Sequence, residues 1–117
     1  MKLIIHVDNS DFFRKIMRTF LIQEGFEVES YDSLNEAAIA IAGGTACMVI
    51  TGLTFAGESD DSFVSEIAQS YAGPLIIVSS SINKKKEGEL RSNGVKAAFN
   101  KSDNWQEAIR PYLQAVK

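Results

Sequence analysis

The sequence has very little cysteine and no excess of positive charge. A single cysteine, Cys47, among 117 residues excludes a disulfide framework within the chain. We therefore expect an apolar core to hold the fold together in a reducing, cytoplasmic compartment. The formal net charge of -3 gives no electrostatic basis for direct binding to nucleic acid. The one basic cluster, residues 84–86, is followed at once by Glu87, which is typical of a solvated helix face.

Charge is also missing from one long internal stretch. No residue from Ala37 to Gly57 is charged, and a window of this length could be mistaken for a membrane span. The stretch is rich in alanine, glycine and threonine, and Gly-Gly-Thr at residues 43–45 divides it into two segments with different periods. We therefore expect no membrane segment here.

Short apolar runs alternate with amphipathic segments along the chain. The apolar runs predict five strands, and apolar residues at helical spacing between them predict five helices. The predicted strands are residues 2–7, 26–31, 46–51, 74–79 and 96–100. The predicted helices begin at Asn9 or Ser10, at Ser33, at Asp60 or Asp61, at Ser81, and near Asp103.

This alternation predicts one α/β domain over residues 1–117, with a parallel sheet between two layers of helices. Polar residues alternate with apolar ones in the second predicted strand, which marks it as an edge strand. The expected fold class is therefore flavodoxin-like, a (βα)5 three-layer sandwich with strand order 2-1-3-4-5.

The helical stripes identify the side chains expected to face the sheet. The second helix should place Leu34, Ala37, Ala38 and Ile41 inward. In the fourth helix Leu90 is the only strong apolar anchor, so we expect this helix to be the least stable. The first helix should bury Phe13, Ile16, Met17, Phe20 and Leu21, and the last should bury Trp105, Ala108, Ile109, Tyr112, Leu113 and Val116.

Polar or small residues follow four of the predicted strands. Asp8 and Asn9 follow the first strand, Gly52 follows the third, Ser79 ends the fourth, and Lys101 follows the fifth. The carboxyl ends of parallel strands meet at one edge of the sheet, and ligand sites lie there. We therefore expect these five residues to converge.

Four segments with this order and spacing resemble the receiver domains of two-component response regulators. They are HVDNSDFFRKIM after the first strand, CMVITGL at the third, PLIIVSS at the fourth and GVKAAFNKSD around the fifth. In that family, an acidic pair after the first strand and an aspartate ending the third bind Mg²⁺. The aspartate also accepts a phosphoryl group, whose oxygens are held by a hydroxyl after the fourth strand and a lysine after the fifth.

The resemblance implies a role for each strand-end residue, with departures. Asp8 matches the first acid, whereas Asn9 matches the second and has lost its charge. Gly52 matches the phosphoacceptor and offers no nucleophile. Ser79 and Lys101 match the hydroxyl and the lysine. With one carboxylate left of three, we expect no metal site, and Mg²⁺ binding that is weak or absent.

Further departures support this interpretation. Ala98 stands at the position of an aromatic switch residue, Ser102 replaces a proline, and Phe55-Ala56 replaces Met-Pro. Lys101 should lack its family partner at position 52, so we predict that it turns to Asp8 or points to solvent.

The leading hypothesis is an atypical receiver domain that is not an enzyme and acts by protein–protein interaction. Its expected partners are a histidine kinase, an output domain or another receiver. The face formed by the fourth helix, the fifth strand and the last helix would contact them or support a homodimer. Two alternatives stay open: phosphorylation at a loop acid among residues 58–61, and a sensor that binds a small anion at Lys101. We interpret His6 as a core histidine with satisfied hydrogen bonds rather than a metal ligand.

Overall fold

The computed structural model describes residues 1–55, 58–59, 61–80 and 82–117. Its main sheet has five parallel strands in the order β2-β1-β3-β6-β7. This is the predicted order 2-1-3-4-5, and the second strand is an edge as its polar alternation indicates. The strands are β1 (Leu3–Val7), β2 (Glu27–Tyr31), β3 (Ala46–Thr51), β6 (Leu75–Ser79) and β7 (Ala97–Asn100).

A second, two-stranded sheet follows β3, and the sequence patterns did not predict it. Its strands β4 (Thr54–Phe55) and β5 (Glu58–Ser59) pair antiparallel. Two residues on each side are too few to produce a detectable period of alternation. This short hairpin extends the chain beyond the end of β3 before the third helix begins.

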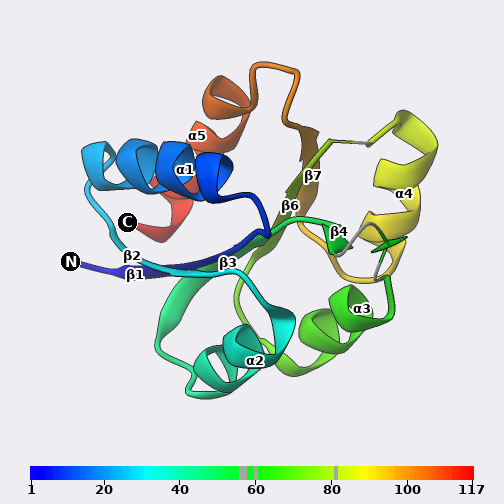
Figure 1. Ribbon diagram of the computed structural model, residues 1–117, viewed down its shortest axis with the longest axis horizontal. Helices are drawn as coiled ribbons and strands as arrows, with labels where there is room; N and C mark the ends of the chain where they lie inside the picture. The colour runs from blue at the N-terminus through cyan, green and yellow to red at the C-terminus, as the bar shows by residue number, and fades with distance from the viewer. Residues whose placement is uncertain (56–57, 60, 81) are drawn as a thin grey trace.

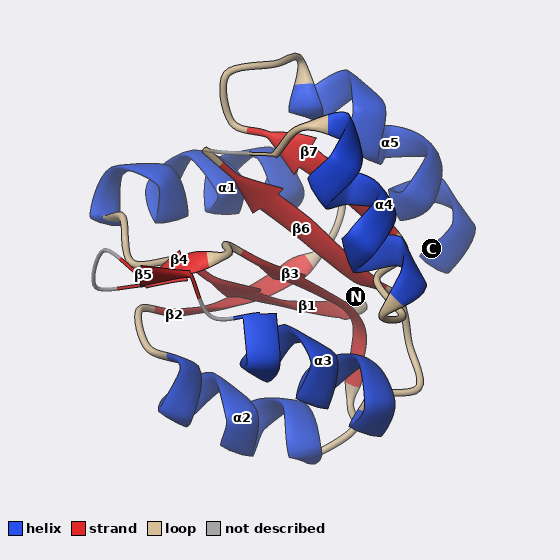
Figure 2. Ribbon diagram, turned by 90° about the vertical axis from the view of Figure 1, so that its right-hand side faces the viewer, coloured by secondary structure: helices blue, strands red, loops and turns tan. Residues whose placement is uncertain are grey.

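The helices cover both faces of the main sheet, as predicted. Figures 1 and 2 show α1 and α5 on one face, and α2 and α3 side by side on the other. The remaining helix, α4, packs against β7. The helices are α1 (Asp11–Gln23), α2 (Leu34–Ala42), α3 (Asp61–Ser70), α4 (Lys84–Ser92) and α5 (Trp105–Val116).

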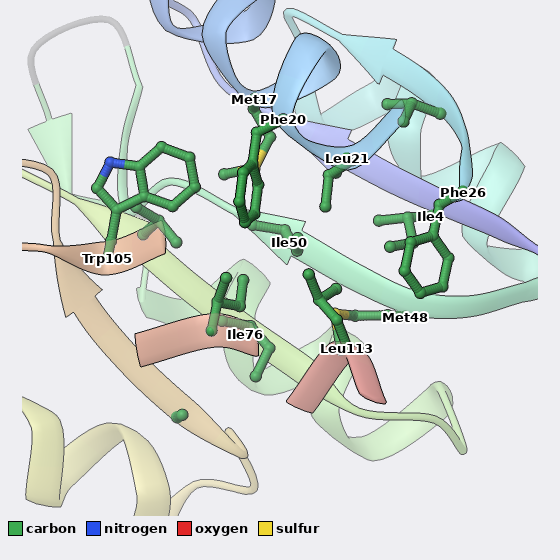
Figure 3. Packing of buried hydrophobic residues seen from close by; sticks show 14 of the residues in the cluster. Ile4, Met17, Phe20, Leu21, Phe26, Met48, Ile50, Ile76, Trp105 and Leu113 are labelled. Atoms are coloured by element: carbon green, nitrogen blue, oxygen red, sulfur yellow. The ribbon is translucent and has the colours of Figure 1, made fainter. Parts of the chain in front are cut away.

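Two apolar clusters form the core, one on each face of the sheet. The cluster under α1 and α5 includes Phe20, Phe26, Trp105 and Leu113 (Figure 3). The rings of Phe20 and Trp105 pack edge to face, with centroids 5.3 Å apart. The buried position of Trp105, which is 6% exposed, confirms it as a core residue. The other cluster lies under α2, α3 and α4, where Leu90 is the buried anchor of α4.

Side-chain caps mark the starts of α1, α2 and α4. Ser10 caps α1, because its hydroxyl accepts a hydrogen bond from the Phe13 amide at 3.1 Å. The prediction that α4 begins at Ser81 was wrong. Asn83 accepts a hydrogen bond from the Lys86 amide at 2.7 Å, so the helix begins at Lys84. Ser81 itself lies outside the described residues. Two caps were predicted for α3: Asp60 also lies outside the described residues, and Asp61 is the first residue of the helix.

The orientation of α2 also corrects one prediction. Ala37 and Ile41 are buried and Leu34 packs against them, as predicted, but Ala38 is exposed. A position adjacent to the inward stripe faces solvent when the helix rotates by a fraction of a turn, and alanine tolerates either environment. In the part of the chain that the structure describes, no helix is both long and apolar enough to span a membrane.

His6 is a buried polar residue in the core beneath α1. It is fully buried in β1, and its ring lies 5.9 Å from the ring of Phe13. The predicted core position is confirmed, but its hydrogen bonds are not satisfied: neither ring nitrogen has a partner among the described residues. Burial lowers the pKa of His6 to about 4, opposed by the charge of Asp8 and assisted by Lys101 and Arg14.

The lowered pKa of His6 predicts loss of stability in mild acid. Below the ordinary value of 6.5 the unfolded chain binds a proton that the folded chain rejects until about pH 4. The free energy of unfolding should therefore fall by about 3 kcal/mol as the pH drops through this window. His6→Leu should remove that part of the dependence. Urea unfolding of both proteins between pH 7 and 4 measures the difference, and parallel curves would contradict the prediction.

Candidate functional site

The carboxyl ends of the strands meet in register at one edge of the sheet. Val7 pairs with Thr51, and the Gly52 amide donates to the Val7 carbonyl at 2.9 Å. The Lys101 amide donates to the Ser79 carbonyl, also at 2.9 Å. These bonds continue the ladders by one residue past the strand ends. The backbone thereby places the residues that follow β1, β3 and β7 close to each other.

Asp8 is the centre of this edge. Its side chain is 2% exposed, and Oδ1 accepts a hydrogen bond from the Ser10 amide at 2.9 Å. The guanidinium of Arg14 donates to the Asp8 backbone carbonyl at 2.5 Å. The other carboxylate oxygen, Oδ2, lies 2.8 Å from Nζ of Lys101. Of the two predicted orientations of Lys101, the turn toward Asp8 is therefore confirmed.

The ion pair compensates a charge that is otherwise isolated. Apart from the Lys101 ammonium, the buried Oδ2 of Asp8 has no partner among the described residues. A buried carboxylate without compensation costs several kcal/mol, so the Lys101 ammonium is what makes this position tolerable. The ammonium also lies 4.3 Å from the centroid of the Phe13 ring, where the aromatic face adds a cation–π attraction. Phe13 and Asp8 together therefore hold Lys101 in place.

Gly52 provides the space that this ion pair needs. A Cβ atom at position 52 would lie 3.1 Å from Oδ2 of Asp8 and 3.7 Å from its Cγ. Gly52 does not have a positive φ, so the backbone conformation itself does not require glycine. A larger residue at this position would require the Asp8 carboxylate to move by a few tenths of an ångström. Glycine is therefore favoured at position 52 because the Asp8 carboxylate lies close to it, and not because the backbone adopts a turn conformation that only glycine tolerates.

The remaining predicted site residues are not brought into the same contact. Ser79 is buried at the end of β6 and is linked to Lys101 through the backbone. Asn9 is exposed, although it directly follows Asp8. Ala98 is buried in β7, within the core cluster beneath α4. Within the described residues, no group of three or more histidine, cysteine or acidic side chains could hold a metal ion.

Asn100 is a site residue that the sequence analysis missed. Its side-chain oxygen accepts a hydrogen bond from the Ile82 amide at 3.1 Å, and its amide nitrogen donates to the Ile82 carbonyl. This two-way contact holds Ile82, just before α4, against the end of β7. An asparagine at a strand end is the only signal in the sequence, and it does not identify a partner 18 residues away.

The Asp8–Lys101 contact predicts a measurable coupling energy. Lys101→Met should destabilise more than Asp8→Asn, because it leaves a buried charge, whereas the lysine without its partner is 23% exposed and reaches water. A double-mutant cycle by urea unfolding should give about 1–3 kcal/mol of coupling.

A surface ion pair provides the matched control. Arg91 and Glu87 lie 4.0 Å apart, and their side chains are 48% and 36% exposed. The cycle with Arg91→Met and Glu87→Gln should give less than about 0.5 kcal/mol. Equal coupling energies for the two pairs would show that burial of Asp8 does not strengthen its interaction with Lys101.

Comparisons with known proteins find the likeness in three dimensions rather than in sequence. No protein-family model matches the sequence. No curated protein gives a significant match either. Many solved structures, in contrast, match over nearly the whole chain.

Three of these structures illustrate the match. A CheY-like response regulator receiver domain protein from Methanospirillum hungatei has a TM-score of 0.85 at 15% identity, over 99% of this chain and 94% of that chain. Chemotaxis protein CheY4 of Vibrio cholerae has a TM-score of 0.81 at 21% identity, over 100% of this chain and 99% of its own.

The third structure is a receiver domain in an activated form. It is the BeF3-activated N-terminal receiver domain of Klebsiella pneumoniae RstA, with a TM-score of 0.86 at 12% identity, over 99% of each chain. At these identities the likeness concerns the arrangement of strands and helices. The chain therefore has the fold of the receiver domains of response regulators, as its four sequence segments imply.

Proposed function

We propose that this chain is an atypical receiver domain that acts by protein–protein interaction, without phosphorylation of an aspartate at the third strand. The observation that carries the proposal is the 2.8 Å ion pair of Lys101 with Asp8 beside Gly52. The position of the phosphoacceptor has no nucleophile. The lysine that would hold a phosphoryl group is bound to a carboxylate instead.

The charge balance of the edge supports a site without metal or phosphate. One buried carboxylate faces one ammonium, so little net charge is left to attract either Mg²⁺ or an anion. Asn9 adds no negative charge and is exposed. We therefore propose that Mg²⁺ binding is weak or absent and that the domain is not an enzyme. Because Lys101 is already paired with Asp8, we favour the interaction domain over a sensor that binds a small anion at Lys101.

The face formed by α4, β7 and α5 is the proposed contact surface for a signalling partner in the cytoplasm. A hollow of about 270 Å³ lies between these elements, with Ala98 and Asn100 of β7 in its lining. Lys84 and Glu87 of α4 also line it, so the hollow has a charged rim. A histidine kinase, an output domain or another receiver would bind there. The net charge of -3 does not favour nucleic acid.

The bidentate contact of Asn100 with Ile82 supports a defined shape for this surface. Both residues line the hollow, and their two hydrogen bonds hold Ile82 against the end of β7.

The proposal predicts that the natural chain does not respond to Mg²⁺ or acetyl phosphate. Its melting temperature should not change with Mg²⁺, and intact-mass spectrometry should find no phosphoryl adduct. The double variant Asn9→Asp/Gly52→Asp restores the missing carboxylates. It should be less stable by about 1–3 kcal/mol without metal, because the new side chain crowds Asp8 at 3.1 Å. Added Mg²⁺ should raise its melting temperature.

The two proteins together make the test decisive. A phosphoryl adduct on the variant alone, at position 52, supports loss of the acceptor as the reason for inactivity. An adduct on the natural chain overturns the proposal, and peptide mapping to residues 58–61 would identify the loop-acid alternative. A stabilising effect of Mg²⁺ on the natural chain would equally contradict a site without metal.

A further inference from the structure

The main sheet has two edge strands, β2 and β7, and they differ in how well they are protected. β2 carries the charged side chains of Glu27 and Glu29, and the guanidinium of Arg18 donates to its Val28 carbonyl at 2.9 Å. Charged side chains and covered main-chain groups are means by which an edge strand resists the addition of another strand. β7 reads Ala-Ala-Phe-Asn at residues 97–100, so it has no charge, and no described side chain binds its main chain.

The register of β6 and β7 shows which main-chain groups of β7 face outward. The Ser79 carbonyl of β6 accepts a hydrogen bond from the Lys101 amide at 2.9 Å, so Ser79 and, two residues earlier, Ile77 face β7. Ile77 pairs in register with Ala98. In a parallel ladder a residue bonds the two neighbours of its register partner rather than the partner itself. The N–H and C=O groups of Ala98 therefore point away from the sheet.

These two groups of Ala98 have no partner among the described residues. Ala98 is 3% exposed, so bulk water reaches them poorly. A buried main-chain group without a partner costs about as much as a lost hydrogen bond, and nearly all such groups in native proteins are paired. The edge of β7 at Ala98 therefore calls for one donor and one acceptor from outside the described chain.

A hollow of about 270 Å³ gives access to this edge between α4 and α5. Both helices contact β7, and Figure 1 shows one on each side of it. Ala98 of β7 and Ala108 of α5 line the hollow, and their short side chains leave its space open. Lys84, Glu87 and Asp103 in the lining carry both signs of charge, so the hollow has no preference for an acidic or a basic partner. Its distinctive feature is the unpaired main chain.

We propose that an extended segment of a partner protein binds in this hollow and adds to β7 as a sixth strand of the main sheet. Its main chain donates to the Ala98 carbonyl and accepts from the Ala98 amide. Main-chain bonds at a sheet edge supply affinity, and the pockets beside the edge supply specificity. A helical segment cannot form these bonds, because its main-chain groups bond one another. The inference rests on the function proposed above, since it names the kind of segment that the α4, β7 and α5 face binds.

β2 gives the matched comparison on the opposite edge. The Asp8 amide donates to the Tyr31 carbonyl at 3.0 Å, so Tyr31 faces β1 and its neighbour Ser30 faces outward. Ser30 therefore has the same place on the protected edge that Ala98 has on β7. Strand addition should occur at Ala98 and not at Ser30, because Arg18 and the two glutamates protect β2.

A library of short random peptides displayed on phage tests the proposal. It is selected on the natural chain without Mg²⁺, and enriched peptides are then synthesised. Ala98→Pro removes the outward N–H and spares the ladder to β6, because an edge strand tolerates proline where the N–H faces outward. It should weaken peptide binding, measured by fluorescence anisotropy, at least about tenfold. Ser30→Pro is the matched control, since it removes the corresponding N–H of β2, and should leave the affinity unchanged.

Amide hydrogen exchange keeps the test independent of the folding of any variant. In the free natural chain the Ala98 amide should exchange faster than the amides of Ala97 and Phe99, which the ladder protects. Saturation with an enriched peptide should slow the Ala98 amide at least about tenfold and leave the Ser30 amide unchanged. An Ala98 amide that stays unprotected overturns the proposal. So do peptides that bind Ala98→Pro as tightly as the natural chain, and a selection that enriches no peptide.

The remaining outcomes separate this inference from the function on which it rests. Protection of the Ala98 amide that rises with the concentration of the chain alone identifies a second copy as the occupant and overturns a partner segment. Peptide binding is measured without Mg²⁺ or a phosphoryl donor. Failure to enrich a peptide therefore leaves the absence of phosphorylation intact, whereas a phosphoryl adduct on the natural chain overturns the proposed function and leaves the peptide result unchanged.

Discussion

Burial of the central strands on both faces is the constraint on which this structure depends. β1, β3 and β6 carry apolar side chains toward both sides, and the two core clusters use them in turn. Such strands exclude water only when helices cover both faces, and crossover helices make the strands parallel. All carboxyl ends then lie at one edge. That geometry, rather than any local motif, brings together Asp8, Gly52 and Lys101 from three separate strand ends.

Once Asp8 is buried at that edge, its charge decides the character of the site. A carboxylate with 2% exposure needs a cation, and Lys101 is held within reach by the ladder of β7 and by the ring of Phe13. Glycine at position 52 permits this approach. Gly52 and the Asp8–Lys101 ion pair are thus parts of one arrangement. The two apolar core clusters include none of these three residues.

The two ends of the sheet carry different surfaces. The carboxyl edge is closed by an ion pair, and the hollow between α4 and α5 lies beside it. The opposite edge, where β3 begins, carries an apolar helix surface and a larger hollow between α2 and α3.

The sequence by itself determined the order of the five helices and the five main-sheet strands, the edge position of β2 and the residues at each strand end. Apolar periodicity reports these features directly, because it records which side chains face the core. Tertiary structure alone decided the rest. These features all depend on packing between distant segments: the start of α4 after Asn83, the exposure of Ala38, the contact of Asn100 with Ile82, and the absence of partners for His6 among the described residues. The sequence left two orientations open for the Lys101 side chain, toward Asp8 or toward solvent. The structure decides for Asp8, because the two charges lie 2.8 Å apart and Coulomb attraction depends on their separation in space.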